Sequence, residues 1–217
     1  MPKMFEIQNR QSPLDLLEIG ERVELPTIYG SFELLPFLEP PTGKEHMMLM
    51  KGQVENQRNL LVRIHSACAT GDLFGSMRCD CGEQLHQALR LIEQAGCGAL
   101  IYLQQEGRGI GLMEKMKAYK LQEQGIDTVD ANLQLGHQAD ERNYLAAAEI
   151  LRHLNISQVK LLTNNPAKKS GLEKYGIKVE CCIPLLIEPN RHNAFYLRTK
   201  KKRMGHLLGK LNFENHE

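Results

Sequence analysis

The sequence predicts an α/β fold with a mixed sheet, arranged in three α/β/α layers as a single compact domain. The chain has 217 residues, of which 42% are hydrophobic and 24% charged, a composition typical of one globular domain. Short apolar runs broken by proline and glycine fill the first part of the chain and predict a strand-rich, antiparallel N-terminal portion. From about residue 82 onward, helical and strand patterns alternate, which is typical of an α/β core.

The strand-rich portion follows a predicted N-terminal extension over residues 1–20, whose last apolar residues suit a short helix. Four apolar runs then predict strands: VELPTIYG, SFELLPFL, HMMLMKG and LLVRIH. Pro26 and Pro36 lie inside the first two runs. Because proline has no N–H to donate to a ladder, we expect those strands to lie at an edge or to end irregularly.

The remainder of the chain is predicted to alternate. Apolar periodicity indicates helices over residues 82–95, about 110–124, 141–154, 166–176 and 192–208, the last of them basic. Strands are expected between them, over 98–105, 158–163 and one or two within 177–187. No internal repeat or low-complexity linker interrupts the pattern, so we expect one catalytic unit over residues 21–208 and a C-terminal tail over 209–217.

The charge balance excludes several classes of function. Lys and Arg number 27 against 26 Asp and Glu, a net charge of +1, so the chain lacks the bulk positive field that coats nucleic acid or anionic lipid. The first residues show no apolar signal-peptide core, and no run approaches the roughly 18 apolar residues of a membrane span. We therefore expect a cytoplasmic protein that partners neither nucleic acid nor a membrane. Its six cysteines are then ligands, catalytic groups or buried thiols rather than disulfides.

Three of the cysteines cluster in the sequence. Cys68 precedes Cys79 by eleven residues, and Cys81 follows at the predicted start of a helix. Three thiolates can bind one zinc ion and leave its fourth position for water, as catalytic sites require. The spacing also allows a structural zinc completed by His65 or Cys97, or three buried thiols without a metal, so all three readings stay open at this point.

Four polar segments end predicted strands or begin predicted helices: RIHS (63–66), QQEGRGIGL (104–112), QADER (138–142) and LLTNNPAKK (161–169). Arg108 lies between two glycines in the second, where the backbone can approach a ligand closely. Together the segments contribute Arg63, Arg108, Arg142, Lys168 and Lys169. Because ligands of α/β sheets bind at strand ends, converging cations predict a polyanionic substrate such as a triphosphate. For Lys169 alone, a solvated surface charge is the favoured interpretation.

Six ordered blocks match a known family. RIHSACATGDLFGSMRCDCGEQL, QQEGRGIGL, AYKLQEQGIDTVDAN, LGHQADERNY, LLTNNPAKK and KKRMGHLL occur in this order, and from about residue 23 to 208 the chain resembles GTP cyclohydrolase II of riboflavin biosynthesis. The resemblance implies opening of the imidazole ring of GTP at C8, with release of formate and pyrophosphate, to give 2,5-diamino-6-ribosylamino-4(3H)-pyrimidinone 5′-phosphate.

The resemblance also implies roles for individual residues. Cys68, Cys79 and Cys81 would hold one zinc ion per subunit. Tyr119 matches a residue that assists at the ring, Asp140 the presumed proton acceptor, and Arg142 a proposed nucleophile at the α-phosphate. Because guanidinium stays protonated, stabilisation of transition-state charge is at least as plausible for Arg142. The GTP contacts fall on Arg63, Ile64, His65, Ser66, Ala67, Gln84, Glu106, Gly107, Arg108, Thr128, Thr163 and Lys168. Of these, Gln84 and Glu106 suit recognition of guanine. The resemblance further implies magnesium with the pyrophosphate and a homodimer. We expect a stand-alone form, since the length leaves no room for the family's fused synthase partner.

One position departs from the family. Glu usually precedes the first cysteine, whereas this chain has Ala67. The departure leaves room for a paralogue whose product is formylated or has only lost pyrophosphate, or for a non-catalytic zinc protein that binds guanine nucleotide. The basic run from Arg198 to Arg203 would suit binding of nucleic acid in that last case, but such a run is more often a solvated helix face.

Overall fold

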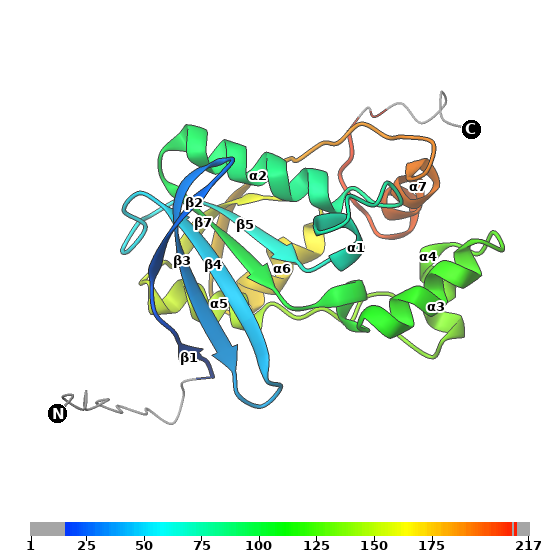
Figure 1. The fold of residues 1–217 in the computed structure, drawn as a ribbon, viewed down its shortest axis with the longest axis horizontal. Coiled ribbons are helices and arrows are strands. Elements are labelled where there is room, and N and C mark those ends of the chain that lie inside the picture. The colour runs from blue at the N-terminus through cyan, green and yellow to red at the C-terminus, as the bar shows by residue number, and fades with distance from the viewer. Residues whose placement is uncertain (1–15, 210, 212–217) are drawn as a thin grey trace.

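The structure is a computed structural model that describes residues 16–209 and 211. Its centre is a mixed sheet with the strand order β1-β3-β4-β6-β5-β7-β8, in which β2 also pairs with β3 (Figure 1). The strands are β1 (Glu18–Ile19), β2 (Val23–Thr27), β3 (Gly30–Glu39), β4 (Lys44–Lys51), β5 (Leu60–Ser66), β6 (Gly98–Leu103), β7 (Gln158–Leu162) and β8 (Lys178–Ile183). The helices are α1 (Ala69–Asp72), α2 (Cys81–Ala95), the 3-10 helix η1 (Glu106–Gly109), α3 (Leu112–Gln122), α4 (Thr128–Gln134), α5 (Leu145–His153), α6 (Pro166–Lys174) and α7 (Ala194–Arg203).

The sheet has an antiparallel half and a parallel half. Strands β1, β2, β3 and β4 pair antiparallel, and β4 also runs antiparallel to β6. Strands β6, β5, β7 and β8 are parallel to one another. The predicted mixed sheet with an antiparallel N-terminal portion is therefore confirmed. Figure 1 shows β1 to β4 in blue, and α1, α3, α4 and α7 beyond the carboxyl ends of β5 and β6.

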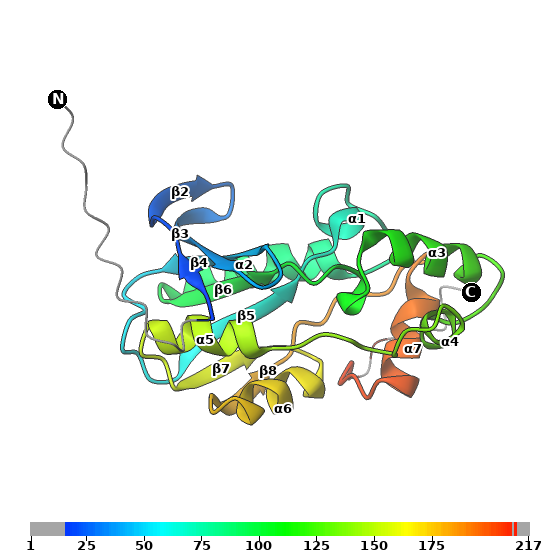
Figure 2. The same cartoon turned by 90° about the horizontal axis from the view of Figure 1, so that it is seen from below.

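Helices cover both faces of the sheet and bury a separate apolar core on each, which confirms the three layers (Figure 2). On one face, α2 buries Ala88, Leu89 and Ile92 against Leu100 of β6. On the other face, α5 and α6 pack against the sheet over the larger core. Ile150 of α5 is fully buried there. These apolar stripes hold the sheet rigid, so its strand ends can position polar side chains.

Several elements differ from the predictions at their ends. The short helix suited to the residues before Gly20 is replaced by β1, which pairs with β3; residues 1–15 of the predicted extension lie outside the described residues. Pro26 lies in β2, which pairs only with β3, as expected of proline. Pro36 lies in β3, an inner strand, at the point where its partner changes from β2 to β1, so no ladder donor is lost.

Two short helices were not predicted from the apolar periodicity. The four-residue α1 and the seven-residue α4 are too short to show an apolar repeat, and α4 begins where the Asp127 side chain accepts hydrogen bonds from the N–H groups of Val129 and Asp130. The helix expected over 141–154 begins only at Leu145, because residues 140–144 form neither helix nor strand.

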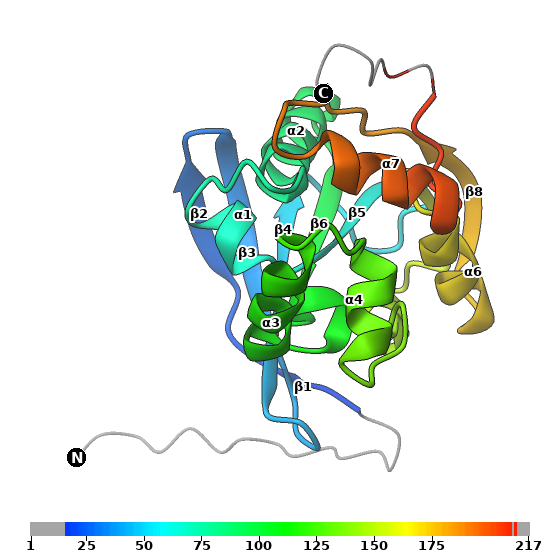
Figure 3. The ribbon, with the colours of Figure 1, turned by 90° about the vertical axis from the view of Figure 1, so that its right-hand side faces the viewer.

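The topology places a crevice at the carboxyl end of β5. This strand lies between β6 and β7, both parallel to it, and the connecting helices α2 and α5 lie on opposite faces of the sheet. Such a switch point is where ligands of open α/β sheets bind. Figure 3 looks onto this end and shows α1, α3, α4 and α7 arranged around it.

Candidate functional site

A cleft lies at the carboxyl ends of β5, β6 and β7 and contains about 1030 Å³ of space, part of it open to solvent. Its wall carries seven cationic side chains: Arg63, Arg78, Arg108, Lys115, Arg142, Lys168 and Lys200. Glu106 is the one acidic residue on the wall. The net charge of the whole chain is near zero, but basic side chains outnumber acidic ones on the wall of this cleft, which suits a polyanion.

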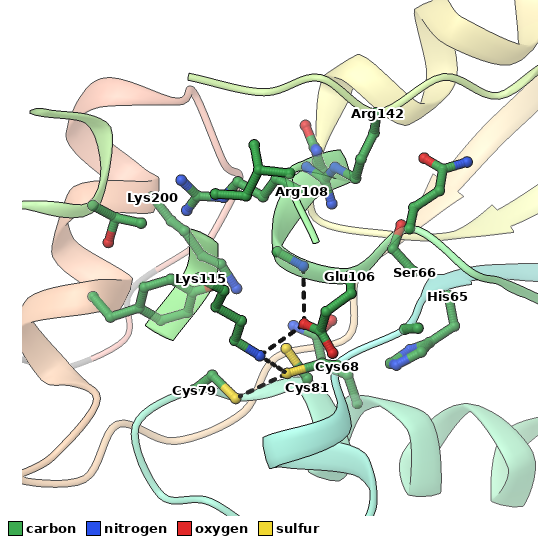
Figure 4. A pocket seen from close by; sticks show the side chains of 18 of the residues that line it. His65, Ser66, Cys68, Cys79, Cys81, Glu106, Arg108, Lys115, Arg142 and Lys200 are labelled. Atoms are coloured by element: carbon green, nitrogen blue, oxygen red, sulfur yellow. Dashed lines mark hydrogen bonds and ion pairs between the residues drawn. The ribbon is translucent and has the colours of Figure 1, made fainter. Parts of the chain in front are cut away.

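The three clustered cysteines meet at one end of the cleft. Cys68 precedes α1, whereas Cys79 and Cys81 lie at the start of α2, and their sulfur atoms are all within 4.8 Å of one another (Figure 4). The Sγ atoms of Cys68 and Cys79 are 3.7 Å apart. Three soft donors at this separation fit a zinc ion, which Cys68, Cys79 and Cys81 would hold and which could bind one further ligand from the cleft.

Neither suggested fourth protein ligand joins the cluster. His65 instead shares a proton with Asp72, whose carboxylate lies 3.1 Å from its Nε2. Cys97 Sγ donates to the carbonyl of Gln53. Among the described residues, the group able to hold a metal therefore consists of the three cysteines alone, which favours an open site over a closed structural one.

The cluster releases its first proton readily. Hydrogen bonds from the Cys79 and Cys81 thiols, together with the ammonium of Lys115 at 3.1 Å, hold the pKa of Cys68 far below its usual range. The same sharing raises the pKa of Cys79 to about 11. One thiolate therefore forms without a metal, and a divalent cation would displace the other two protons as it binds.

Asp72 fixes the position of Cys68. Its buried carboxylate accepts hydrogen bonds from the Cys68 backbone N–H at 2.9 Å and from the Tyr102 hydroxyl at 2.9 Å, in addition to the contact with His65. Two strands, β5 and β6, and the start of α1 thus meet on one side chain. The sequence offered no signal for Asp72, because nothing in its spacing separates it from an ordinary first-turn acid.

The glycine-rich segment forms a left-handed turn. Gly107 and Arg108 have φ values of 63° and 65°, a conformation that an arginine seldom adopts. Both terminal guanidinium nitrogens of Arg108 are buried without a hydrogen-bond partner. Strain and unpaired donors at one residue are typical of a site prepared for a ligand, and an anion would satisfy both nitrogens.

Glu106, predicted to contact guanine, is occupied by the protein itself. Its Oε2 accepts from the N–H of Ala69 at 2.6 Å. Its Oε1 accepts from the N–H of Gly107 and from Lys115 Nζ at 2.8 Å. Figure 4 shows Lys115 lying between this carboxylate and Cys68. Glu106 in this arrangement ties the glycine-rich turn to the residue after the first cysteine.

Tyr119 lies beside the metal end of the cleft. Its hydroxyl is 3.4 Å from Thr70 Oγ1, and its ring stacks under the guanidinium of Arg78 at 4.3 Å. Burial raises the pKa of Tyr119 above its ordinary value, so the phenol keeps its proton at neutral pH. A protonated phenol at this position can donate to a ring nitrogen of a bound base.

Asp140 and Arg142 form a bidentate pair. Arg142 donates from Nε at 2.8 Å and from Nη2 at 2.5 Å to the two carboxylate oxygens. Burial opposes ionisation of Asp140, but the guanidinium dominates and lowers its pKa. Arg142 lines the cleft, whereas Asp140 lies behind it. Arg142 is thereby held oriented and charged, and Asp140 in this arrangement is a weak base.

Two more predicted residues lie deep in the wall. Arg63 Nη2 donates to Gln84 Oε1 at 2.7 Å, and Lys168 Nζ donates to the Ile64 carbonyl at 2.7 Å. Burial, reinforced by Arg63 and Arg142, lowers the pKa of Lys168 well below its usual value. Burial and mutual repulsion therefore disfavour the charged form of Lys168 beside Arg63 and Arg142. A negatively charged ligand would offset both effects.

Most of the predicted site residues line the cleft together. His65, Ser66, Ala67, Gln84, Gly107, Thr128 and Thr163 do so beside the residues already described, whereas the side chain of Ile64 does not. Lys169 is exposed and pairs with Glu173, in agreement with the solvated alternative.

Other wall residues were missed. They include Arg78, Lys115, Tyr196, Lys200 and His206. The interpretation of the basic run as a solvated helix face is wrong for Lys200, which is only 8% exposed. The sequence signal for this part of the wall was the block KKRMGHLL, which directly follows Lys200 and contains His206 but has no apolar stripe.

The fold and the wall define a cleft that combines three thiols able to hold a metal ion with a wall rich in cations. The sequence comparisons agree: residues 18–184 match the family described as GTP cyclohydrolase II. The chain belongs to this family of hydrolases.

Its relatives carry a further region. A riboflavin biosynthesis protein RibBA of Parabacteroides distasonis is 60% identical over 193 residues, covering 89% of this chain and 48% of that protein. The RibBA of Bacillus subtilis is 51% identical over 203 residues, 93% of this chain and 51% of that protein. The chain thus spans about half the length of the curated relatives it matches. A solved structure of RibBX, a two-domain 3,4-dihydroxy-2-butanone 4-phosphate synthase from A. baumannii, covers 78% of this chain and 40% of that one, with 22% identity and a TM-score of 0.46, a likeness too distant to carry an argument. Within residues 16–209 and 211, no helix has the length and apolarity needed to cross a membrane.

Proposed function

We propose that the protein is a zinc-dependent GTP cyclohydrolase II. It hydrolyses the imidazole ring of GTP at C8, releases formate and pyrophosphate, and leaves 2,5-diamino-6-ribosylamino-4(3H)-pyrimidinone 5′-phosphate for riboflavin synthesis. One observation carries the proposal: the three-thiol cluster and seven cationic side chains share a single cleft. A nucleoside triphosphate can place its base at the first and its phosphates among the second.

The metal end suits zinc. Cys68, Cys79 and Cys81 would hold it, and the helix dipole at the start of α2 favours their charged form. When bound, the metal supplies Lewis acidity and makes water a stronger nucleophile at neutral pH. Lys115 neutralises part of the thiolate charge, and Asp72 keeps Cys68 in place.

The opposite part of the cleft binds the triphosphate. Arg63 and Lys168 contribute buried cationic groups, Arg142 contributes a guanidinium with 12% of its side chain exposed, and Arg108 supplies two donors that lack partners in the protein. Charge-assisted hydrogen bonds of this kind are about twice as strong as neutral ones. Arg142, oriented by Asp140, stabilises the charge that develops at the α-phosphate as pyrophosphate leaves; this role is consistent with a guanidinium that stays protonated.

Tyr119 serves the ring chemistry. Its protonated phenol donates a proton to the base as the ring opens, and the stacked Arg78 fixes its ring plane. Tyr119→Phe retains that stacking and removes only the hydroxyl. We expect kcat to fall by about 10²–10⁴, the usual contribution of a positioned acid, while the KM for GTP changes little. An unchanged kcat would remove Tyr119 from the chemical step.

Several expectations complete the proposal. Magnesium would accompany the departing pyrophosphate, the protein would act as a homodimer, and the reaction would take place in the cytoplasm without nucleic acid or membrane as a partner. These remain predictions based on the family.

The decisive experiment is product analysis. Zinc-loaded protein is incubated with GTP and Mg²⁺, and the products are identified by mass spectrometry. We expect formate, pyrophosphate and the diaminopyrimidinone monophosphate. A formylated product or GMP would instead indicate a paralogue that stops early, a possibility that Ala67 keeps open. Intact GTP after long incubation would refute the proposed activity and leave a non-catalytic nucleotide-binding protein. Cys79→Ser should abolish both zinc retention and ring opening.

A further inference from the structure

The C-terminal helix α7 crosses the open end of the sheet and reaches the cleft. Figures 1 and 3 show it beside α4, opposite the start of α2. Three side chains from this segment line the cleft wall: Tyr196, Lys200 and, just after the helix, His206. None of these residues belongs to the set assigned to GTP above.

The segment is firmly anchored. The N–H of Leu207 donates to the Asn164 carbonyl at 2.8 Å, and Asn164 in turn holds Leu185 through its side chain. Arg203 forms ion pairs with Asp127 and Asp130 at the start of α4. Contacts from two directions thus fix α7 against the rim of the site.

Lys200 makes the central contact. Its Nζ lies 2.5 Å from Asp80 Oδ1, and both side chains are almost fully buried, with 8% and 2% of each residue exposed. The ammonium also lies 4.3 Å above the ring of Tyr196, whose other neighbour is the guanidinium of Arg108 at 5.8 Å. Lys200 is the one of the seven cleft cations to which the proposed function assigns no role.

Asp80 connects Lys200 to both halves of the site. It lies between the two ligand residues Cys79 and Cys81, so its orientation sets the path of that turn. Its second oxygen accepts from Gln84 Nε2 at 2.6 Å. Gln84 then accepts from Arg63 Nη2 at 2.7 Å, and Arg63 Nη1 donates to the Leu162 carbonyl of β7 at 3.0 Å. The chain of contacts runs unbroken from α7 to the sheet.

We propose that Lys200 is a positioning residue: through Asp80 it holds the Cys79–Cys81 turn and the Gln84–Arg63 pair in the geometry that metal and nucleotide require. The role follows from the contacts, since removal of the ammonium leaves the buried carboxylate of Asp80 with an amide as its remaining side-chain partner. The carboxylate then turns toward other donors, and both ends of the cleft lose their alignment. This inference rests on the proposed function, because it assigns a residue to that site.

The test compares Lys200→Met with Lys202→Met, an exposed lysine on the same helix. Zinc affinity is measured by competition with a chromogenic chelator, and kcat and KM with GTP are measured on zinc-loaded protein. Loss of an outer-shell partner typically costs about 10–100-fold in metal affinity or activity. We expect a loss of that size for Lys200→Met, wild-type values for Lys202→Met, and recovery of most of the loss in Lys200→Arg, with far-UV circular dichroism unchanged throughout.

A double variant separates positioning from a general structural effect. If Lys200 acts through Asp80, Asp80→Asn combined with Lys200→Met should lose no more zinc affinity than Asp80→Asn alone. Additive losses would overturn the proposal, as would wild-type zinc affinity and kcat/KM in Lys200→Met. Should that variant fail to fold, Lys200→Gln is measured instead: it replaces the ammonium by a shorter, neutral side chain, and wild-type zinc affinity and kcat/KM in it would likewise overturn the proposal. Failure of the proposed function is recognised separately, because wild-type protein would then leave GTP intact while the zinc measurements still report on Lys200.

Discussion

Gly71 lies in α1 at the centre of the three thiols, and its replacement by alanine gives a quantitative prediction. A Cβ atom at this position would lie 2.8 Å from Cys79 Sγ, 3.1 Å from Cys81 Cβ and 3.3 Å from Cys68 Sγ. Ordinary van der Waals contact begins at 3.4 Å, so the nearest sulfur must move by 3.4 − 2.8 = 0.6 Å. Metal–ligand distances tolerate only about 0.2 Å. The added methyl group thus displaces a ligand by about three times that tolerance.

The energetic consequence is a weakened metal site. Overpacking of a tight core costs about 1–3 kcal/mol, which corresponds to about 5- to 150-fold when it is charged to metal binding. Chelator competition on Gly71→Ala should therefore show zinc affinity lower by about one to two decades, with GTP turnover lower in proportion at limiting zinc.

Gly75→Ala is the matched control. Gly75 follows in the same segment with open space around its Cβ position but a φ of 61°, so alanine there costs about 1–2 kcal/mol of backbone strain and does not contact a thiol. Both variants should lower the melting temperature, but only Gly71→Ala should lower zinc affinity. Equal zinc affinities in Gly71→Ala and wild type would refute the packing argument.

Three further predictions concern the cation-rich part of the cleft. Lys168→Met should raise the KM for GTP about 10-fold or more, since hydrogen bonds to charged groups contribute about 1.5–3 kcal/mol. Its melting temperature should not fall, because the variant removes a buried cation that neighbouring cations repel. A lower melting temperature with unchanged KM would contradict this. Arg142→Lys keeps the charge but loses the bidentate fork with Asp140, so kcat should fall about 10-fold or more; steady-state kinetics with unchanged kcat would exclude the oriented guanidinium. Burial, with Lys200 and Arg142, lowers the pKa of His206 to about 3. The unfolded chain therefore takes up a proton first below about pH 6.5, and stability falls by about 1.4 kcal/mol per pH unit; His206→Gln should flatten urea-unfolding stability between pH 6.5 and 5, and parallel pH profiles would refute this.

The sequence predicted the sheet and most of the long helices because their apolar residues recur with a clear period. Ala88, Leu89 and Ile92 face one core and are spaced as one face of a helix must be. The motif residues also converged as expected, because the ends of β5, β6 and β7 necessarily meet at one edge of a parallel sheet.

What escaped prediction depends on contacts between distant segments. Lys200 resembles its exposed neighbours in sequence, and only Asp80, 120 residues earlier, makes its burial possible. Asp72 and Lys115 carry no spacing signal for the same reason, since their partners come from other elements. The sequence also did not predict that the protein itself hydrogen-bonds Glu106, because the donor is the backbone N–H of Ala69, which every residue except proline has.

The site has a long span along the chain, and this has a consequence for biosynthesis. The three proposed metal ligands have all been made once residue 81 is added, whereas His206 follows 125 residues later. At about 5–20 residues per second, roughly 6–25 s separate the two events on the ribosome. During that interval a nascent chain can present three thiols without the helix that holds Asp80. In the proposed enzyme, zinc capture and competence for nucleotide are therefore acquired at different times, and synthesis of the segment from α7 to His206 completes the wall of the cleft.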